Sequence, residues 1–180
     1  MKILVVIDMQ NDFIGGALGT KEAQAIVPKV AEKIKNFDGK VFYTRDTHDE
    51  KYLETQEGKS LPVKHCIRDT DGWKLTPEID VLCEGDILNK SSFGSIELGF
   101  KLNDYRSNLR VIKNERVESI TLIGVCTDIC VISNAMILKA FFPDKPIIVD
   151  AACCAGSTPE GHKNALAVMK TCQIQIENEE

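Results

Sequence analysis

The residue of this sequence best suited to act as a nucleophile is Cys130. It lies in the stretch 120–133, ITLIGVCTDICVIS, where a short apolar run rich in β-branched residues ends and an apolar run of helical length follows. That pattern predicts a buried strand, a sharp turn and a helix whose first turn holds Cys130. The start of a helix presents unpaired N–H groups and a partial positive charge, and both lower the pKa of a thiol. We therefore expect a reactive thiolate at this position.

Two charged residues that could assist a cysteine nucleophile also lie at the ends of predicted strands. Asp8 follows the apolar run 2–7, and Lys90 ends the predicted strand 86–90, DILNK. A carboxylate can take the thiol proton and later give it to a departing amine, and a lysine cation can hold the thiolate. Backbone N–H groups of the turn at 126–130 could bind the oxyanion of a tetrahedral intermediate, an effect typically worth about 2.7–4 kcal/mol per donor. These residues together predict nucleophilic acyl transfer.

A candidate metal site follows the second predicted strand, KVFYT. Asp46 and His48 alternate just after it, so their side chains can point the same way. His65 comes after a polar loop that contains Glu54 and Glu57, either of which could add an oxygen ligand. Two histidines and a carboxylate suit a zinc, iron or manganese ion with open coordination positions. The alternative is a solvated loop with incidental histidines.

The elements that must bring these residues together alternate between strands and helices about six times. Strands are expected at 2–7, 40–44, 86–90, 119–125, 147–149 and 173–176, and helices at 21–37, 77–83, 98–114, 127–142 and 159–172. Pro28 fits the first position of the main part of the helix at 21–37. Loops are expected at 9–20 and 151–157, and a frayed tail at 178–180. This alternation predicts a single-domain, three-layer α/β/α fold, spanning 1–180, with a mainly parallel sheet of about six strands. Because the carboxyl ends of parallel strands meet at one edge, the candidate residues are expected to gather there.

Composition and charge restrict the class of protein. With 180 residues, 43% hydrophobic and 27% charged, the chain resembles an ordinary soluble domain with a sizeable core. A net charge of −5 with scattered basic residues gives no electrostatic case for nucleic acid or for anionic membranes. The apolar run at the N-terminus is too short for a signal peptide or a membrane span. We expect a cytoplasmic protein.

The cysteines are expected to be free thiols. There are seven of them, an odd number, and their spacings match no zinc-finger pattern. In a reducing compartment such thiols stay unpaired. The spacing of Cys126 and Cys130 nevertheless leaves a redox pair as an alternative. No glycine-rich fingerprint opens a helix, which disfavours a nucleotide-binding protein.

Taken together, these motifs resemble those of a known enzyme family. The sequences that carry the resemblance are D-x-Q-N-D-F from Asp8, D-x-H from Asp46 with His65, the lysine at 90, and G-V-C-T-D-x-C-V from Gly124. They are similar to those of the isochorismatase-like cysteine hydrolases, and within that family to the nicotinamidases. The motifs extend from residue 1 to about 155, and their order and number make the resemblance specific.

The resemblance implies a mechanism and a set of residue roles. Asp8, Lys90 and Cys130 would form a catalytic triad, and the backbone N–H groups of Cys126 and Cys130 an oxyanion hole behind a cis peptide bond. The expected reaction is hydrolysis of nicotinamide, a small amide, to nicotinate and ammonia through a cysteine thioester, as a step of NAD salvage. Family members form homo-oligomers, which is the expectation here.

The resemblance also implies a cofactor and a pocket. One divalent metal ion, often zinc, would be held by Asp46, His48 and His65 beside the triad, with a fourth ligand expected at Glu57. This ion would bind the pyridine nitrogen of the substrate. Two aromatic residues, Phe13 and Trp73, resemble walls of the family's substrate pocket.

The sequence departs from the family pattern in two places. Position 126 is commonly a small residue such as alanine and is cysteine here, and the spacing from Glu57 to His65 does not match the pattern with certainty. Two alternatives therefore stand beside the nicotinamidase hypothesis. One is another small amide or ureide hydrolase of the same superfamily. The other is a non-enzymatic redox- or metal-sensing module that uses Cys126 and Cys130.

Overall fold

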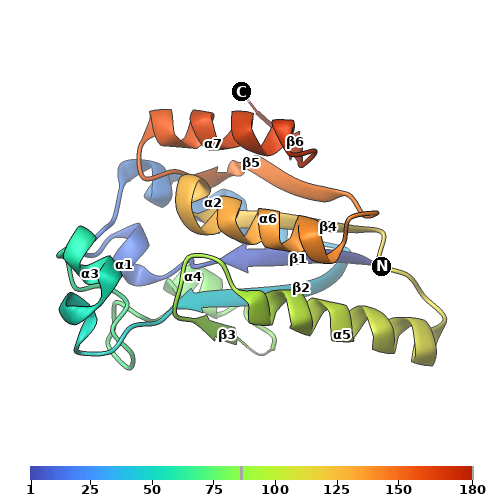
Figure 1. The fold of residues 1–180 in the computed structure, drawn as a ribbon, viewed down its shortest axis with the longest axis horizontal. Coiled ribbons are helices and arrows are strands. Elements are labelled where there is room, and N and C mark those ends of the chain that lie inside the picture. The colour runs from blue at the N-terminus through green and yellow to red at the C-terminus, as the bar shows by residue number, and fades with distance from the viewer. Residues whose placement is uncertain (86, 180) are drawn as a thin grey trace.

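The protein is built on one parallel β-sheet, seen in a computed structural model that describes residues 1–85 and 87–179 (Figure 1). The strands of this part of the chain are β1 (Lys2–Ile7), β2 (Gly39–Asp46), β3 (Ile87–Lys90), β4 (Ser119–Val125), β5 (Ile147–Ala155) and β6 (Gln175–Glu177). They pair in the order β3-β2-β1-β4-β5-β6, and every pairing is parallel. The predicted α/β fold is confirmed, with a sheet that is parallel throughout rather than mainly so.

Helices connect the strands. They are α1 (Asn11–Ile14), α2 (Lys21–Lys35), α3 (Gln56–Ser60), α4 (Pro77–Asp80), α5 (Ile96–Lys113), α6 (Ile132–Phe141) and α7 (Pro159–Thr171), with a 3-10 turn η1 (Tyr52–Glu54) and a π-helical turn η2 (Thr127–Val131). Several begin with a side-chain cap: Thr20 accepts the Ala23 N–H, and Thr158 accepts the Gly161 N–H. Such caps typically contribute about 1 kcal/mol each.

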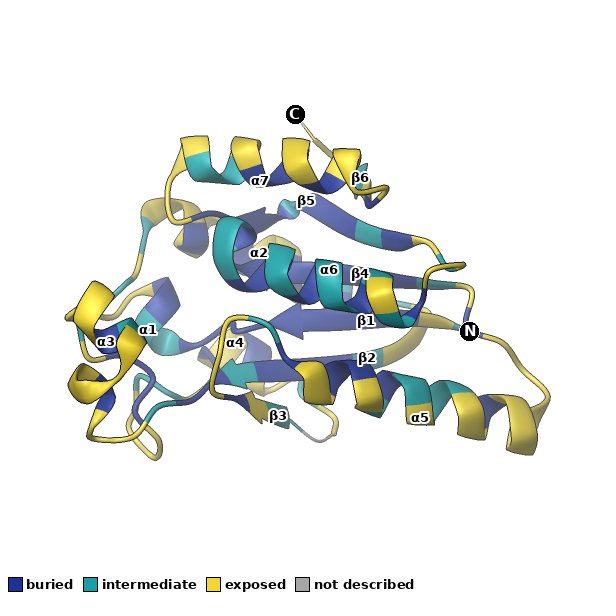
Figure 2. Ribbon diagram, viewed as in Figure 1, coloured by how far each residue is buried: buried dark blue, intermediate teal, exposed yellow. Residues whose placement is uncertain are grey.

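Strand β1 is central because it is apolar on both faces. Its residues Ile3, Val5 and Ile7 pack into a core with α5, α6 and α7, whereas Leu4 and Val6 pack into a second core with α2 and α4. Successive side chains of a strand point to opposite faces, so this uninterrupted run requires cover on both sides. Figures 1 and 2 show the resulting three layers, with buried strands between helices whose outer faces are exposed.

The order in which strands are added to the sheet reverses between the neighbouring strands β1 and β4. Strands β2 and β3 extend from one side of β1, and β4, β5 and β6 from the other. In open parallel sheets, ligands bind outside the carboxyl ends of the strands at such a switch point. In Figure 1 these ends point left, toward α1 and α3.

A glycine allows β4 to approach β1 closely near this point. Gly124 has a φ of +121° at a register irregularity between β4 and β5. A Cβ atom there would collide with the carbonyl oxygen of Ile7, the residue before Asp8. The position therefore requires glycine, and it brings the ends of β1 and β4 together.

Some predicted boundaries were wrong. Strand β5 continues to Ala155, although 151–157 was expected to be a loop, because its small residues pair with Gly124 and Val125. Pro28 lies inside a continuous α2 instead of at the start of its main part. The short helices α1 and α3 lie in segments expected to be loops. Of the predicted strand 86–90, residue 86 lies outside the described residues, as does the last residue of the predicted tail.

Helix lengths also bear on membranes. No helix within residues 1–85 or 87–179 is long and apolar enough to cross a lipid bilayer.

Candidate active site

A buried lysine lies at the centre of the candidate site. The Lys90 ammonium, at the end of β3, is 2.7 Å from Asp8 Oδ2, 3.3 Å from Asp46 Oδ1 and 3.4 Å from Cys130 Sγ. All four residues are buried. The ends of β1, β2 and β3 and the turn after β4 thus bring together residues that are up to 122 positions apart, as the sheet-edge argument predicts.

The charges of this group are set by burial and by mutual contact. Burial raises the pKa of Asp8, and the nearby Lys90 cation only partly offsets that rise. Burial also opposes the charge of Lys90, but the surrounding Asp8, Cys130 and Asp46 hold the pKa of Lys90 above its usual value. The Thr44 hydroxyl donates a hydrogen bond of 2.7 Å to Asp8 Oδ1 and fixes the carboxyl group.

The expected low pKa of Cys130 is wrong for the free protein. Burial and the neighbouring Asp8 raise the pKa of this thiol well above its ordinary value, and Lys90 opposes them only in part. The helix-start argument assumed a solvated thiol, whereas Cys130 is 5% exposed. The thiol therefore keeps its proton at neutral pH, so a base must remove that proton during reaction.

The turn that carries Cys130 is π-helical at its start. The Val131 N–H donates to the Cys126 carbonyl oxygen at 3.0 Å, five residues back, and the peptide bond between Val125 and Cys126 is cis, as the resemblance implies. Buried Asn134 holds the turn from the other side by donating to the Cys130 carbonyl at 2.8 Å. The Cys126 N–H makes no hydrogen bond to the described part of the chain.

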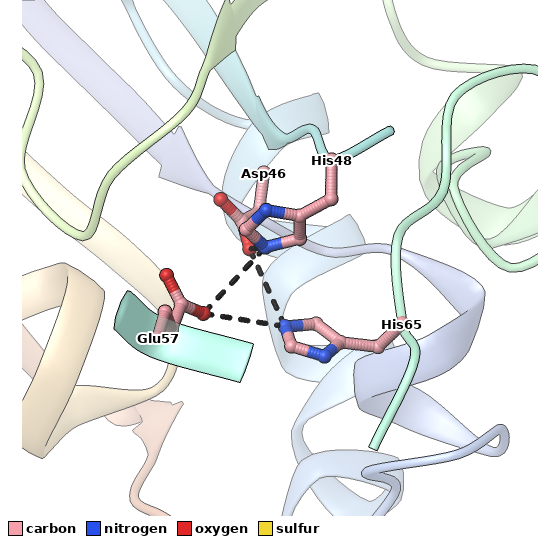
Figure 3. Close-up of side chains that lie close together, drawn as sticks. All are labelled: Asp46, His48, Glu57 and His65. Atoms are coloured by element: carbon pink, nitrogen blue, oxygen red, sulfur yellow. Dashed lines mark hydrogen bonds and ion pairs between the residues drawn. The ribbon is translucent and has the colours of Figure 1, made fainter. Parts of the chain in front are cut away.

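A second cluster lies beside the lysine. Asp46, His48, Glu57 and His65 each offer one ligand atom, and these four atoms all lie within 4.8 Å of one another. Figure 3 shows the two imidazole rings and the two carboxylates converging, with Glu57 reaching in from α3. Glu54, the other candidate glutamate, is exposed and outside this cluster.

The distances in the cluster suit a small divalent cation. Glu57 Oε1 is 3.6 Å from His48 Nε2 and 3.7 Å from His65 Nε2, and Asp46 Oδ2 is 2.9 Å and 3.6 Å from the same two nitrogens. Tetrahedral ligands at about 2.0–2.1 Å from zinc are about 3.3–3.4 Å apart. Two nitrogens and two carboxylate oxygens are also a donor set that zinc, iron and manganese accept. The residues therefore fit a metal ion.

Surrounding contacts orient the two histidines. His65 Nδ1 lies 2.8 Å from the Val63 carbonyl oxygen, which requires a proton on Nδ1 and leaves Nε2 free as a ligand. The buried ring of Tyr52 packs against both imidazoles, with ring centroids 4.6 and 4.9 Å away. Asp46 is held ionised: burial opposes its charge, but contacts with His48, His65 and Lys90 keep its pKa well below the usual range.

Both groups contribute to the lining of one cavity of about 610 Å³. Cys130 of the lysine group lines it together with Cys126, and so do Asp46, Glu57 and His65 of the second cluster. Phe13, a predicted wall, lines it and lies 5.6 Å from the His65 ring. Sequence reasoning missed four further apolar lining residues: Leu18, Leu61, Phe93 and Ile129. Phe93 had a usable signal, because it lies three residues after Lys90 in the loop SSFGS.

The prediction that Trp73 forms a pocket wall is wrong. Trp73 is not among the residues that line the cavity. Its indole N–H donates to Thr47 Oγ1 at 2.8 Å, and the Arg45 guanidinium lies 3.5 Å from its ring centroid. Sequence alone could not separate the two aromatics, since both were expected to lie in loops and only their tertiary contacts differ.

Known proteins share this fold and this length. The nicotinamidase/pyrazinamidase of Mycobacterium tuberculosis is 26% identical over 186 residues, which cover 98% of each chain. The solved structure of a pyrazinamidase/nicotinamidase from Streptococcus mutans is 27% identical with a TM-score of 0.79, over 98% of this chain and 99% of that one. The pyrazinamidase of Pyrococcus horikoshii, solved in complex with zinc, is 29% identical with a TM-score of 0.73 over 97% of each chain.

Family membership follows from a match of nearly the whole chain. Residues 2–180 match the isochorismatase domain, the family that the sequence motifs resemble. The chain belongs to the isochorismatase domain family.

Proposed function

We infer that this protein is a nicotinamidase, an amidohydrolase that converts nicotinamide and water into nicotinate and ammonia. The observation that carries this inference is a single cavity lined by Cys130, which contacts buried Lys90 beside Asp8, and by three members of the four-ligand cluster. Relatives of matching length are named nicotinamidases and pyrazinamidases. The reaction would feed nicotinate into NAD salvage.

In the first half of the proposed reaction, the enzyme becomes acylated. Asp8 accepts the thiol proton of Cys130 as Sγ attacks the amide carbonyl carbon, and the carbonyl oxygen takes up the negative charge. The N–H groups of Cys126 and Cys130 would stabilise that oxyanion. Asp8 then gives its proton to the nitrogen, the C–N bond breaks, ammonia leaves and a thioester remains.

In the second half, water releases the acid. Asp8, now a carboxylate, takes a proton from a water molecule that attacks the thioester carbon. Collapse of the tetrahedral intermediate breaks the C–S bond, and the thiol regains its proton. Lys90 stays charged throughout, and its contacts with Asp8 and Cys130 hold the two groups in place.

We further propose that Asp46, His48, Glu57 and His65 hold one divalent ion, with zinc as the expected metal. A bound ion of this kind supplies a Lewis acid that can orient a pyridine nitrogen. The zinc complex of the Pyrococcus horikoshii pyrazinamidase supports that choice. The Phe13 ring lies beside the same end of the cavity and would contact a flat aromatic substrate.

An ammonia-release assay on nicotinamide, combined with metal analysis, tests the function. The wild-type protein should release ammonia and contain about one equivalent of metal. Cys130→Ala should lose turnover, and Cys172→Ser, which removes an exposed thiol, should keep it. Substantial ammonia release by Cys130→Ala would sink the thioester mechanism. Full activity of a protein with no bound metal would remove the metal-ligand assignment.

A substrate panel separates the alternative activity. Pyrazinamide turnover would support a pocket for pyridine-like rings, while preference for N-carbamoyl compounds would favour a ureide hydrolase. For the redox alternative, all cysteines among the described residues are free. Mass spectrometry after mild oxidation and thiol alkylation would reveal any Cys126–Cys130 disulfide.

We also propose that the protein is a homo-oligomer. The side chains of Ile96 and Phe100 on α5 are 57% and 58% exposed, which suits burial against another subunit. Light scattering on the eluate of a sizing column measures the molar mass, and a value near 20.0 kDa would contradict the proposal.

A further inference from the structure

We propose that Gln10 and Asp12, in the segment just after β1, are positioning residues that hold the ligand-bearing segments of the metal site in place. The inference rests on the proposed metal site and extends it. Neither residue lines the cavity, so each would act through the ligands that it holds.

The side chain of Gln10 continues the pairing of β2 beyond the point where its neighbour β1 ends. The β1–β2 pairing ends at Val6 and Tyr43, yet β2 continues for three more residues to Asp46. The Gln10 side-chain amide supplies the missing partner: its Nε2 donates to the Asp46 carbonyl at 2.8 Å, and its Oε1 accepts the Asp46 N–H at 2.7 Å. Nε2 also donates to the Trp73 carbonyl at 2.9 Å.

This arrangement fixes the backbone of the residue that joins the two groups of the site. Asp46 contacts Lys90 through Oδ1 and His48 through Oδ2. Gln10 is fully buried, so loss of its amide would leave backbone groups without partners and free Asp46 to shift. We therefore expect loss of the Gln10 amide to weaken metal binding, because Asp46 is itself a proposed ligand.

Asp12 holds the other ligand segment. Its Oδ2 accepts the N–H of Cys66, the residue after His65, at 2.7 Å. Cys66 in turn accepts the His48 N–H at 3.0 Å. Both histidine ligands are therefore connected through Cys66 to the Asp12 carboxylate, and neither Asp12 nor Cys66 lines the cavity.

Gln10 and Asp12 belong to the same short segment as the triad residue Asp8. Gln10 and Asp12 lie two and four residues after Asp8, so one short segment carries a triad member and both supports of the metal site. Groups that orient metal ligands typically change metal affinity about 10–100-fold when removed. We expect changes of that size for zinc.

The experiment measures zinc affinity by competition with a fluorescent chelator, together with the melting temperature. Gln10→Met keeps the side-chain volume and removes the amide, and it should weaken zinc binding about 10–100-fold. Asp12→Ala should do the same, whereas Asp12→Asn keeps an oxygen acceptor for the Cys66 N–H and should bind zinc within about threefold of wild type.

Asn134→Leu is the matched control. Asn134 is also a fully buried amide with three hydrogen bonds, to Ser95, Phe93 and Cys130, none of which is a proposed metal ligand. It should lower the melting temperature about as much as Gln10→Met and leave zinc affinity unchanged.

The outcomes separate this inference from the proposed function. If wild type binds zinc and Gln10→Met binds it equally well, the positioning role is wrong and the metal site stands. An equal loss of affinity in Asn134→Leu also overturns it, because the effect would then be general destabilisation. If wild type binds no zinc, cobalt or manganese, the metal site itself fails and the inference fails with it.

Discussion

The buried Lys90 ammonium faces two carboxylates and one thiol. Asp8 and Asp46 carry two negative charges against the one positive charge of Lys90. A thiolate would add a third negative charge in a buried site, so the thiol keeps its proton. Burial makes each unpaired charge costly, so the group is expected to respond as a unit when one member changes. Of the two carboxylates, Asp8 is suited to take the proton, because its pKa is raised whereas that of Asp46 is lowered.

Asp8→Asn tests that role. The substitution keeps the shape of the side chain and removes its ability to accept a proton, so kcat should fall about 10²–10⁴-fold. Lys90 would retain Asp46 as its counter-ion, and the fold should survive. Steady-state ammonia release measures the effect, with circular dichroism and metal content as controls. A decrease of less than tenfold in a folded, metal-containing variant would exclude Asp8 as the base.

A histidine away from the metal cluster predicts a pH dependence of stability. His162 Nδ1 lies 2.8 Å from Thr127 Oγ1, and burial lowers the pKa of His162 below its ordinary value despite the nearby Asp128 and Glu179. The unfolded chain then binds more protons than the native state below about pH 6.5. The contribution of His162 is therefore fully present above that pH and decreases as the pH falls.

Urea unfolding at pH 7.5 and pH 5.5 measures this contribution. Other groups titrate in the same range, so the comparison is with His162→Asn, which can keep the hydrogen bond to Thr127 and does not titrate. The free energy of unfolding of wild type should decrease more on acidification than that of the variant. Parallel decreases would show that His162 has an ordinary pKa in the native state.

At the residue scale, the sequence predicts identities better than environments. Asp8, Lys90 and Cys130 could be found because each lies at or just after the end of a predicted strand, and the strand ends of a parallel sheet converge. The protonation of Cys130 could not be found, since it depends on burial and on residues as distant in sequence as Asp8 and Asp46. The position of Trp73 likewise depends on Arg45 and Thr47, which the local pattern does not connect to it.

In helix α2, packing against the sheet outweighs the tendency of proline to interrupt a helix. Pro28 interrupts the hydrogen-bond ladder of Lys21–Lys35, yet the helix continues through it because Ala23, Val27 and Val30 are buried against the sheet. Sequence reasoning instead placed Pro28 at a helix start, where proline is favourable. The packed face of α2 therefore stabilises an element that contains an unfavourable residue.

Pro28→Ala should stabilise the protein. Pro28 is exposed, so its replacement removes little packing. Alanine is about 3 kcal/mol more favourable than proline inside a helix, and the greater freedom of the unfolded chain offsets part of that, so we expect a gain of about 1–3 kcal/mol. Urea unfolding measures it, with the neighbouring exposed Lys29→Ala as a control expected to stay within about 0.5 kcal/mol. A loss of stability would mean that the proline ring makes a necessary contact.

Short or irregular elements were the hardest to predict. The helices α1 and α3 have four and five residues, too few for a periodic apolar pattern. The final part of β5 consists of alanine and cysteine, which have little intrinsic strand preference, and forms because Cys154 and Ala155 pair with the end of β4. Glu57 reaches the metal cluster only because α3 folds over it, which no spacing rule indicates.

For the whole molecule, the strand order determines which functional residues lie next to each other. Alternating strands and helices predict a parallel sheet, but not that β1 lies between β2 and β4. That order brings Asp8 beside both Asp46 and the Cys130 turn. The same order divides the site into a rigid part, formed by strand ends, and a peripheral part, formed by the loop that contains Glu57 and His65.

Metal removal should therefore loosen the periphery and leave the sheet intact. The residues of β1 and β4 bury their side chains independently of the cluster, whereas η1 and α3 have few other apolar contacts, mainly through Tyr52. Chelation should leave the far-ultraviolet circular dichroism at 25 °C unchanged and increase amide hydrogen exchange in residues 52–65. Zinc at a hundredfold excess over its dissociation constant contributes about 2.7 kcal/mol, so the melting temperature should fall by about 5–10 °C when it is removed. Loss of the sheet signal on chelation, or unchanged exchange in 52–65, would contradict this division of the molecule.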